Sequence, residues 1–284
     1  MAQKHQSNTY TQGHSKFTTA TQQARTAKSD ADFLLPYIKK TDYILDVGCG
    51  PGTITRGLAK HASDGSTLGI DLSPSVIQKA KTLAAEAADI PTQGPGSVTF
   101  EEGNVLERLV YPDESFDVVF ASQVFGYLVP APDVPLRALA EIRRVLKPGG
   151  IIATRDAAAQ HFYPRSLDLD RHWVHNFTRS IYKGEPPKDT TGMMMPALYR
   201  KAGFDAGKVQ IGMGTKVFSG PDTRKFLAWR AEGQLKEGDP FRQSWLNSGI
   251  SVEEIDQAMK AIRKWSETED AWHVLVQCEM LAWK

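Results

Sequence analysis

The chain has 284 residues, of which 41% are hydrophobic and 24% charged, and its formal net charge is +1. Such a composition is typical of a globular protein that can bury a full core. The near-neutral charge gives no electrostatic reason to expect nucleic acid or an anionic membrane as a partner. No apolar run approaches membrane-spanning length, and the polar start lacks the apolar segment of a signal peptide. Two cysteines provide no disulfide framework, so we expect a cytoplasmic protein.

Residues 1–28 are interpreted as a flexible N-terminal arm. The segment is rich in Gln, Thr and Ser, and it is too poor in apolar residues to fold alone. Tyr10, His14 and Phe17 are nevertheless spaced through it, so part of the arm could order over a ligand as a lid. For residues 1–9 a frayed tail is an equally good interpretation.

Residues 29–156 show strands alternating with helices, which indicates a parallel sheet covered on both faces. Ser29 or Asp30 can cap a short helix, and Ser73 with a following proline can open a longer one. Another helix is expected to end at the segment 147–150, Lys-Pro-Gly-Gly. The predicted strands are 43–47, 66–70, 98–101, 116–121 and 151–154.

Residues 157–284 are expected to complete the same domain with two more strands and a set of cap helices over the substrate. Aromatic and histidine residues crowd 162–183, and apolar periodicity then predicts four helices. The helices are expected at 190–202, 221–232, 240–247 and 252–265, and the strands at 209–213 and 274–283. The fold class is therefore α/β: a doubly wound, Rossmann-like, seven-stranded and mostly parallel sheet, with an N-terminal arm and inserted cap helices.

The first predicted strand ends in an acid, Asp46, and is followed by glycines at 48, 50 and 52. Glycine in a turn at the carboxyl end of a strand lets a ligand approach the main chain closely. A dinucleotide fingerprint would place a third glycine at position 53, where this chain has Thr53. The turn thus predicts a nucleotide-like ligand and disfavours NAD-linked redox chemistry.

Two polar residues follow the next strands. Asp71 ends the second strand, where a carboxylate can accept both hydroxyls of a ribose, and Asn104 follows the third, with Val105 beside it. This order of acid, glycines, acid and amide over roughly residues 30–156 resembles the class I S-adenosylmethionine-dependent methyltransferases. The resemblance implies S-adenosyl-L-methionine as cofactor and S-adenosyl-L-homocysteine as product.

The resemblance also implies a role for each matched residue. The glycines would pass under the methionine part of the cofactor, with Asp46 near its ammonium group. Asp71 would hold the ribose, Asn104 and Val105 would border the adenine, and Ser122 and Gln123 would flank the sulfonium. The complete set of expected cofactor-binding residues is Tyr10, Arg25, Asp46, Gly48, Cys49, Gly50, Gly52, Asp71, Leu72, Asn104, Val105, Ser122 and Gln123.

A narrower resemblance includes the arm. The segments 10–14 (Tyr-Thr-Gln-Gly-His), 25–27 (Arg-Thr-Ala) and 155–156 (Arg-Asp) are similar to the ubiquinone-methyltransferase-like small-molecule branch, including its fungal gliotoxin bis-thiomethyltransferase type. The branch implies that the arm folds over the cofactor, with Tyr10 and Arg25 at its carboxylate. The chain departs from the branch at 122–128, which lack its usual histidines, and at 157–159, where three alanines replace a further acid.

The acceptor side is predicted from residue types. Asp156 is our candidate for a general base or an acceptor-orienting group, and the alternative is an ion pair with Arg155 or Arg171. Aromatic residues could wall an apolar acceptor site, or they could simply form core. No Cys, His and acid spacing indicates a metal. The candidate substrate residues are Phe125, Tyr127, Phe162 and Trp173.

The function expected from these patterns is methyl transfer from S-adenosylmethionine to a small molecule of secondary metabolism. The resemblance favours S-methylation of thiols or dithiols of a gliotoxin-like natural product. N-, O- or C-methylation of another secondary metabolite or a quinone is an open alternative, as is a non-catalytic regulator that binds the cofactor. The sequence names neither the acceptor nor the oligomeric state, and it gives no reason to expect a nucleic-acid or membrane partner.

Overall fold

The computed structural model describes residues 10, 12–128 and 133–284. The predictions for residues 1–9 and for Thr11 in the arm therefore lie outside the described residues. Seven strands form one sheet in the order β3-β2-β1-β4-β5-β7-β6, and β7 runs antiparallel to both of its neighbours. The predicted fold class is confirmed. No helix in the described ranges is long and apolar enough to span a membrane.

The strands agree with the predictions most closely in the first half of the chain, where β1 has the predicted bounds. The strands are β1 (Tyr43–Val47), β2 (Ser66–Asp71), β3 (Ser97–Glu102), β4 (Phe116–Ser122), β5 (Leu146–Tyr163), β6 (Val209–Phe218) and β7 (Trp272–Trp283). The α-helices are α1 (Lys16–Gln23), α2 (Ala27–Asp30), α3 (Thr53–Ala59), α4 (Pro74–Ala87), α5 (Val134–Val145), α6 (Asn176–Tyr182), α7 (Thr191–Lys201), α8 (Pro221–Gln234), α9 (Pro240–Asn247) and α10 (Val252–Glu267).

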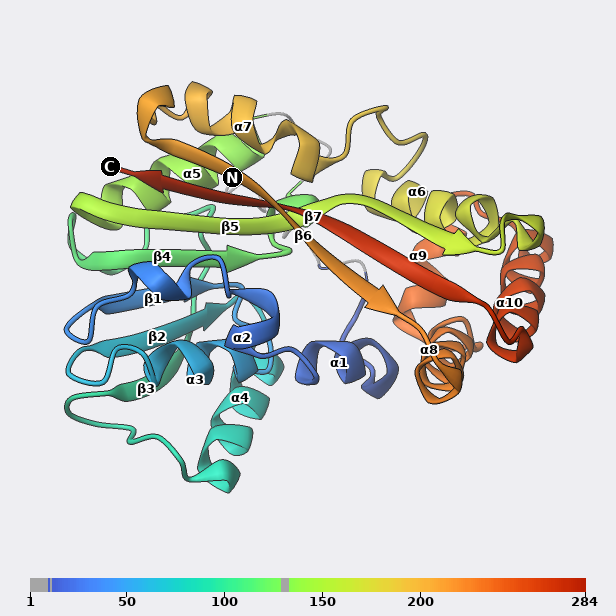
Figure 1. The fold of residues 1–284 in the computed structure, drawn as a ribbon, viewed down its shortest axis with the longest axis horizontal. Coiled ribbons are helices and arrows are strands. Elements are labelled where there is room, and N and C mark those ends of the chain that lie inside the picture. Colours follow the sequence, from blue (N-terminus) through green and yellow to red (C-terminus); the bar gives the residue numbers. More distant parts are fainter. Residues whose placement is uncertain (1–9, 11, 129–132) are drawn as a thin grey trace, which may run out of the picture.

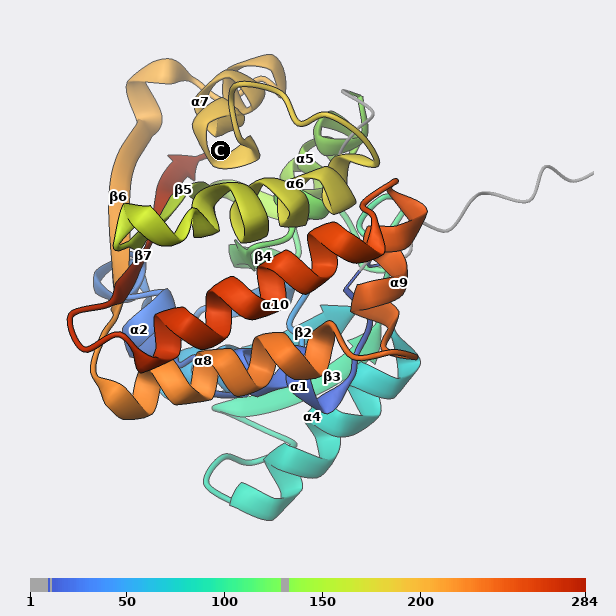
Figure 2. The same cartoon turned by 90° about the vertical axis from the view of Figure 1, so that its right-hand side faces the viewer.

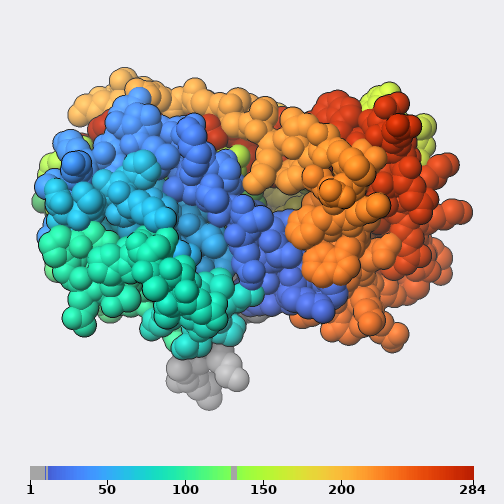
Figure 3. Space-filling view, turned by 60° about the horizontal axis from the view of Figure 1, so that its bottom comes forward, coloured from blue at the N-terminus to red at the C-terminus, as the bar shows by residue number. Residues whose placement is uncertain are grey.

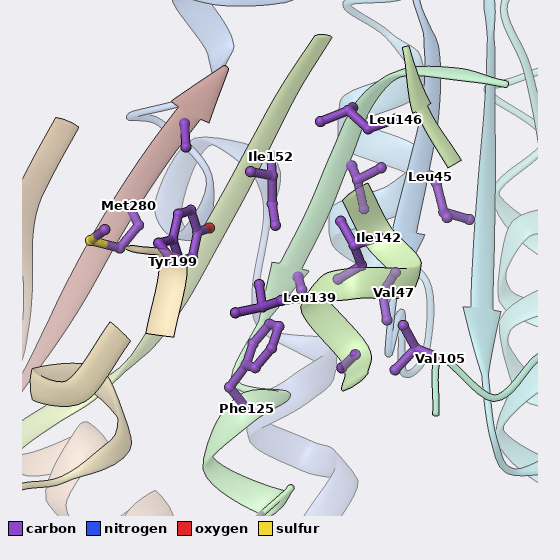
Figure 4. Close-up of a cluster of buried hydrophobic side chains, with 14 of the residues drawn as sticks. Leu45, Val47, Val105, Phe125, Leu139, Ile142, Leu146, Ile152, Tyr199 and Met280 are labelled. Atoms are coloured by element: carbon purple, nitrogen blue, oxygen red, sulfur yellow. The ribbon is translucent and has the colours of Figure 1, made fainter. Parts of the chain in front are cut away.

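Helices cover both faces of the sheet, as its apolar strands require. The largest cluster of buried side chains joins α5 and α7 to one face, with Ile142, Tyr199 and Met280 among them (Figure 4). Two smaller clusters pack α2, α3 and α4 against the other face. Because β1 to β5 are parallel, their carboxyl ends meet at one side of the sheet, which we call the strand edge.

Three long strands carry the second half of the chain beyond the strand edge. β5 continues for 18 residues, and its outer part pairs with β7 as a twisted ribbon (Figure 1). The ribbon leads to the cap, which consists of α6, α8, α9 and α10. Seen from the cap side, α6, α10 and α8 cross in front of the strand edge, and α1 lies behind α8 (Figure 2).

Two predicted boundaries are corrected by the structure. The short N-terminal helix is capped by Thr26, whose side chain accepts a bond from the Ser29 amide, so Ser29 and Asp30 lie inside the helix. The segment 147–150 belongs to β5, because Leu146 already pairs with Phe116 of β4 and the helix ends one residue earlier. The local sequence correctly predicted that the helix ends near this segment, but the two glycines are part of the following strand.

Candidate active site

The glycine turn between β1 and α3 has all three glycines in the left-handed region, with φ of +69° at Gly48, +55° at Gly50 and +77° at Gly52. A Cβ at Gly48 would lie 2.5 Å from Val124, and one at Gly52 would lie 2.5 Å from Phe100. At Gly50 the same atom would meet only the Gln22 side chain, at 4.0 Å. Gly48 and Gly52 thus permit close packing, whereas Gly50 leaves the main chain open to a ligand.

Asp71 organises this turn from the end of β2. One carboxylate oxygen accepts a hydrogen bond from the Gly50 amide at 3.1 Å, and the other accepts one from the Ser73 amide at 3.0 Å. The side chain is half-buried, and the neighbouring Leu72 is 49% exposed. The carboxylate therefore lies beside the open glycine, with one further lone pair available on each oxygen.

The residues after β3 lie next to Asp71, because the Gly103 amide donates to the Asp71 carbonyl at 3.0 Å. The Asn104 side chain accepts from the Leu106 amide at 3.0 Å and donates to Glu107 at 3.1 Å. Val105 is buried in the main core. The predicted ribose and adenine residues are thus neighbours at the strand edge, and their loop is held by its own hydrogen bonds.

Asp46 lies deeper than a ligand-contacting residue would. Its side chain is 2% exposed and accepts a 2.6 Å hydrogen bond from the Thr55 hydroxyl, which ties β1 to α3. Burial raises the pKa of Asp46 to about 7. Cys49 is also buried, and burial raises the pKa of its thiol. Both side chains therefore support the glycine turn from the interior of the protein.

The arm brings two of its predicted residues to the strand edge. The Arg25 guanidinium donates to Gln123 at 2.9 Å, and the Tyr10 hydroxyl accepts from Gln22 at 3.1 Å. The Tyr10 ring meets the Tyr127 ring edge-on at 4.8 Å. These residues are far apart in the sequence, so their grouping at one site agrees with the predicted course of the arm.

The cap holds the arm in this position. The Gln234 amide on α8 donates to Thr18 on α1 at 3.0 Å, and the rings of Phe17 and Trp229 lie 5.0 Å apart. On the other side, the Thr53 hydroxyl donates to the Gln22 carbonyl at 3.3 Å. The described part of the arm is therefore clamped between the glycine turn and α8.

Two polar atoms at the ends of β4 and β5 are buried without a hydrogen-bond partner among the described residues. They are the Ser122 hydroxyl and the Oδ2 atom of Asp156, whose Oδ1 atom accepts from the Gly126 amide at 3.0 Å. Burial raises the pKa of Asp156 to about 7. A buried polar atom without a partner in a native protein calls for an explanation, and a bound ligand is one.

The two arginines that could have paired with Asp156 have other partners. Arg155 is buried between Asp30 at 2.8 Å and Glu279 at 3.0 Å. Arg171 lies 3.8 Å from Asp168. Asp156 thus contacts the main chain of the loop after β4 and keeps one oxygen for another group.

The four candidate substrate residues differ in their surroundings. Phe125 is fully buried in the main core. Phe162 stacks on His273 at 4.1 Å, and Trp173 packs against α9, both inside the core of the cap. This packing favours the core alternative for these three residues. Tyr127 is half-buried and accepts a bond from Gln12 of the arm, so it remains the best placed of the four.

Sequence analysis did not select several polar residues of α8 and β7 that carry atoms without a partner in the described residues, among them Arg230, His273 and Gln277. A single charged or amide residue on a predicted helix or strand has no distinguishing pattern. No group of three or more His, Cys, Asp or Glu side chains in the described ranges could hold a metal ion.

Comparison with known proteins decides the family. A family model described as a methyltransferase domain matches residues 38–191, more than half of the chain. A protein of Aspergillus luteorubrus named "Probable methyltransferase ltbC" is 60% identical over 287 residues, which is 100% of both chains. The chain belongs to the methyltransferase family. The enzyme uses S-adenosyl-L-methionine and releases S-adenosyl-L-homocysteine. The alternative of a non-catalytic regulator is therefore rejected.

Other relatives match more distantly. The 27-O-demethylrifamycin SV methyltransferase of Amycolatopsis mediterranei is 35% identical over 148 residues, covering 52% of this methyltransferase and 50% of the relative. Among solved structures, the YcgJ protein of Bacillus subtilis superposes with a TM-score of 0.54 at 15% identity, covering 89% of this chain and 97% of that chain. The structural match supports the fold.

The strand edge of this methyltransferase fits the cofactor. Gly50 offers bare main chain, Asp71 offers carboxylate lone pairs beside it, and the Ser122 hydroxyl is buried with no partner. Arg25 has no acidic partner in the described ranges, since its one hydrogen bond goes to the Gln123 amide. These groups match the hydroxyl, amine and carboxylate groups that the cofactor presents.

Proposed function

We propose that this methyltransferase acts on a small molecule and transfers the methyl group to the sulfur of a thiol or dithiol. The observation that carries the proposal is the buried, unpartnered Oδ2 atom of Asp156 at the end of β5. A carboxylate there can accept the proton of an acceptor group. Its neighbours Ser122 and Gln123 lie at the end of the adjacent strand, so acceptor and cofactor would share this part of the strand edge.

The pKa of Asp156 favours sulfur over oxygen. With a pKa of about 7, this carboxylate would take a proton from a thiol of pKa about 8.5 at a cost of about 2 kcal/mol. For a phenol of pKa about 10 the same transfer costs about 4 kcal/mol. Proton transfer to Asp156, the carboxylate with a raised pKa on the proposed acceptor side among the described residues, therefore costs less from a thiol than from a phenol.

The enclosure of the strand edge favours a small acceptor. The cap covers the edge, and the described part of the arm is fastened to α8 and to the glycine turn. When bound, S-adenosylmethionine supplies a methyl group on a positively charged sulfonium. The chain contributes alignment, a proton acceptor and the exclusion of water, and alignment alone is worth up to about 7–11 kcal/mol in well-oriented systems.

The finer parts of the proposal follow from the resemblance of the arm to its branch. We infer a gliotoxin-like dithiol of secondary metabolism as acceptor and the cytoplasm as location. Residues 1–28 would act as a lid, 29–156 would bind the cofactor, and 157–284 would complete the sheet and cap the substrate. Methylation of oxygen is the alternative, and the name of the rifamycin relative gives an O-demethyl compound as its substrate.

The experiment is a matched acceptor panel. The purified protein is first titrated with S-adenosylmethionine, S-adenosylhomocysteine and NAD, and we expect binding of the two adenosyl compounds only. It is then incubated with S-adenosylmethionine and one acceptor at a time: benzyl mercaptan, dithiothreitol, 4-cresol or benzylamine. The masses of the products are measured by mass spectrometry. Gain of one or two methyl groups on the thiols supports the proposal. Methylation of the phenol or the amine without the thiols would overturn it.

A further inference from the structure

Arg230 on α8 is a half-buried cation without an acidic partner among the described residues. Its Nε atom is buried and has no hydrogen bond, and Arg230 takes part in no ion pair in the described ranges. Residues 1–9, 11 and 129–132 contain no Asp or Glu, so the rest of the chain has no carboxylate to offer either. Withdrawing part of a guanidinium from water without an acid is unfavourable, because its loss of hydration is not compensated.

Arg224, two turns earlier on the same helix, shows how this chain treats an arginine that serves the fold. Its side chain is more deeply buried than that of Arg230, and it donates to the carbonyls of Ser266 and Ala271 at 3.3 and 3.4 Å. The exposed Arg263 on α10 is likewise paired, with Glu232 at 2.6 Å. Arg230 therefore differs from both types of structural arginine in the cap.

Arg230 faces the part of the active site where the arm meets the loop after β4. It interacts electrostatically with Tyr10, Tyr127 and Arg25, and burial lowers its pKa to about 10, which leaves it charged at neutral pH. Two guanidinium groups thus act on the same region, and the groups that interact favourably with Arg230 there are two tyrosines and not a carboxylate. Figure 3 shows an opening in the surface between the blue N-terminal segment and the orange chain that leads into α8.

Three further side chains on α8 and β7 carry buried polar atoms without a partner in the described part of the chain. Gln234 follows Arg230 by one helical turn, and its Oε1 atom is buried and unbonded. The Nε2 atom of His273 on β7 is also unbonded, and the positive charge of Arg230 is one cause of the lowered pKa of His273, after burial. Both side-chain polar atoms of Gln277, on the same face of that strand, are unbonded as well.

A polar ligand would satisfy these unbonded atoms, and the positive charges of Arg230 and Arg25 favour a ligand with a negative charge. The cofactor brings one carboxylate, for which Arg25 and Tyr10 are the expected partners. Arg230 is a second positive group in the same region, contributed by the cap, and it is left for the other ligand. The rings of Tyr10 and Tyr127, which lie 4.8 Å apart in this region, could contact an apolar body of that ligand.

We propose that Arg230 binds a carboxylate on the methyl acceptor, so that the enzyme selects an acidic small molecule with an apolar body. The inference deepens the proposed function and rests on it only in placing the acceptor beneath the cap. A charge-assisted contact in a partly buried site distinguishes a carboxylate from the matching carboxamide by about ten- to hundredfold in affinity. Arg230 would thereby determine specificity without taking part in methyl transfer.

The test uses two pairs of probes with the full-length protein saturated with S-adenosylhomocysteine. The pairs are 4-mercaptobenzoate with 4-mercaptobenzamide, and 4-hydroxybenzoate with 4-hydroxybenzamide. We expect each carboxylate to bind at least tenfold more tightly than its carboxamide. In R230Q this affinity ratio should fall to a value between about 1 and about 3, while R263Q should keep the wild-type ratio. The ratio of R230K should lie between those of R230Q and the wild type. Binding of S-adenosylhomocysteine should stay within about threefold in all variants.

Each result separates this inference from the proposed function. A carboxylate preference without methylation of any thiol would support the role of Arg230 and overturn the sulfur acceptor. Equal affinity for acid and amide in the wild type, or no measurable binding of either, would overturn the role of Arg230. Loss of S-adenosylhomocysteine binding in R230Q with an unchanged ratio would assign Arg230 to the cofactor instead. R230Q should also melt no lower than the wild type, because it removes an unpaired buried charge, and a lower melting temperature would indicate a structural role.

Discussion

The two ends of the active site differ in how their polar groups are satisfied. Among the residues predicted to bind the cofactor, Asp46, Asp71 and Asn104 each hold a hydrogen bond to their own chain, and the Ser122 hydroxyl is the exception. On the proposed acceptor side, Asp156, Arg230 and Gln277 keep atoms that nothing in the described chain satisfies. A site for a constant ligand can be held in place by the chain itself, whereas these unpartnered atoms are available to bind the acceptor. The predictions below test this difference.

The largest effect is expected at the glycine turn. Gly52→Ala places a Cβ 2.5 Å from Phe100 and forces a left-handed conformation, so we expect a loss of about 2–5 kcal/mol in the free energy of unfolding and no measurable cofactor binding. Gly50→Ala is the matched control, because it shares the left-handed backbone but its Cβ meets only the Gln22 side chain at 4.0 Å. It should lose less stability than Gly52→Ala yet weaken S-adenosylmethionine binding. Denaturant unfolding and calorimetric titration measure both, and equal destabilisation by the two variants would contradict the distinction.

The next effect is expected at Asp156. Asp156→Asn keeps the shape and the contact with the Gly126 amide but removes the proton acceptor, so kcat on a thiol should fall by about 10²- to 10³-fold. Affinity for S-adenosylhomocysteine should not change. The wild-type kcat/KM should rise with pH up to about 7 as the carboxylate loses its proton, and this rise should be missing in the variant. An unchanged pH profile would argue against a base at this position.

A smaller effect is expected at Asp71. Asp71→Ala removes the carboxylate that bonds the Gly50 and Ser73 amides, and any ribose bonds are lost with it. Each charge-assisted bond contributes about 1.5–3 kcal/mol, so affinity for S-adenosylmethionine should fall at least tenfold. Asp71→Asn should retain part of the binding, since one oxygen remains. Wild-type affinity in a folded Ala variant would exclude Asp71 from the cofactor site.

The smallest effect concerns Asp46 and pH. The folded pKa of about 7 exceeds the unfolded value of 3.8, so the native state binds more protons in this range and stability falls as pH rises from about 4 to 7. Asp46→Asn resembles the protonated form, so its stability relative to the wild type should increase by about 2–3 kcal/mol between pH 5 and pH 8. Denaturant unfolding at the two pH values gives the difference. Asp156 titrates in the same range, so some pH dependence should remain in the variant.

Local sequence determined most of the first half of the chain. A buried apolar run fixes a strand wherever it occurs, and the predicted bounds of β1 agree with the structure. The glycine turn is equally local, because left-handed backbone at three alternate positions requires glycine. Parallel strands with right-handed crossovers bring their carboxyl ends to one edge, so Asp71 and Asn104 could be placed there without coordinates.

Only the tertiary structure decided the acceptor side. The length of β5 depends on pairing with β7, more than a hundred residues later, and the aromatics at Phe162 and Trp173 pack in a cap core that local patterns did not separate from a pocket wall. Arg230 stood out only once its surroundings were visible, because a missing partner is a property of space and not of sequence. Backbone conformation and periodicity are short-range and can be read along the chain, whereas burial and pairing of a side chain depend on segments that meet only in the folded protein.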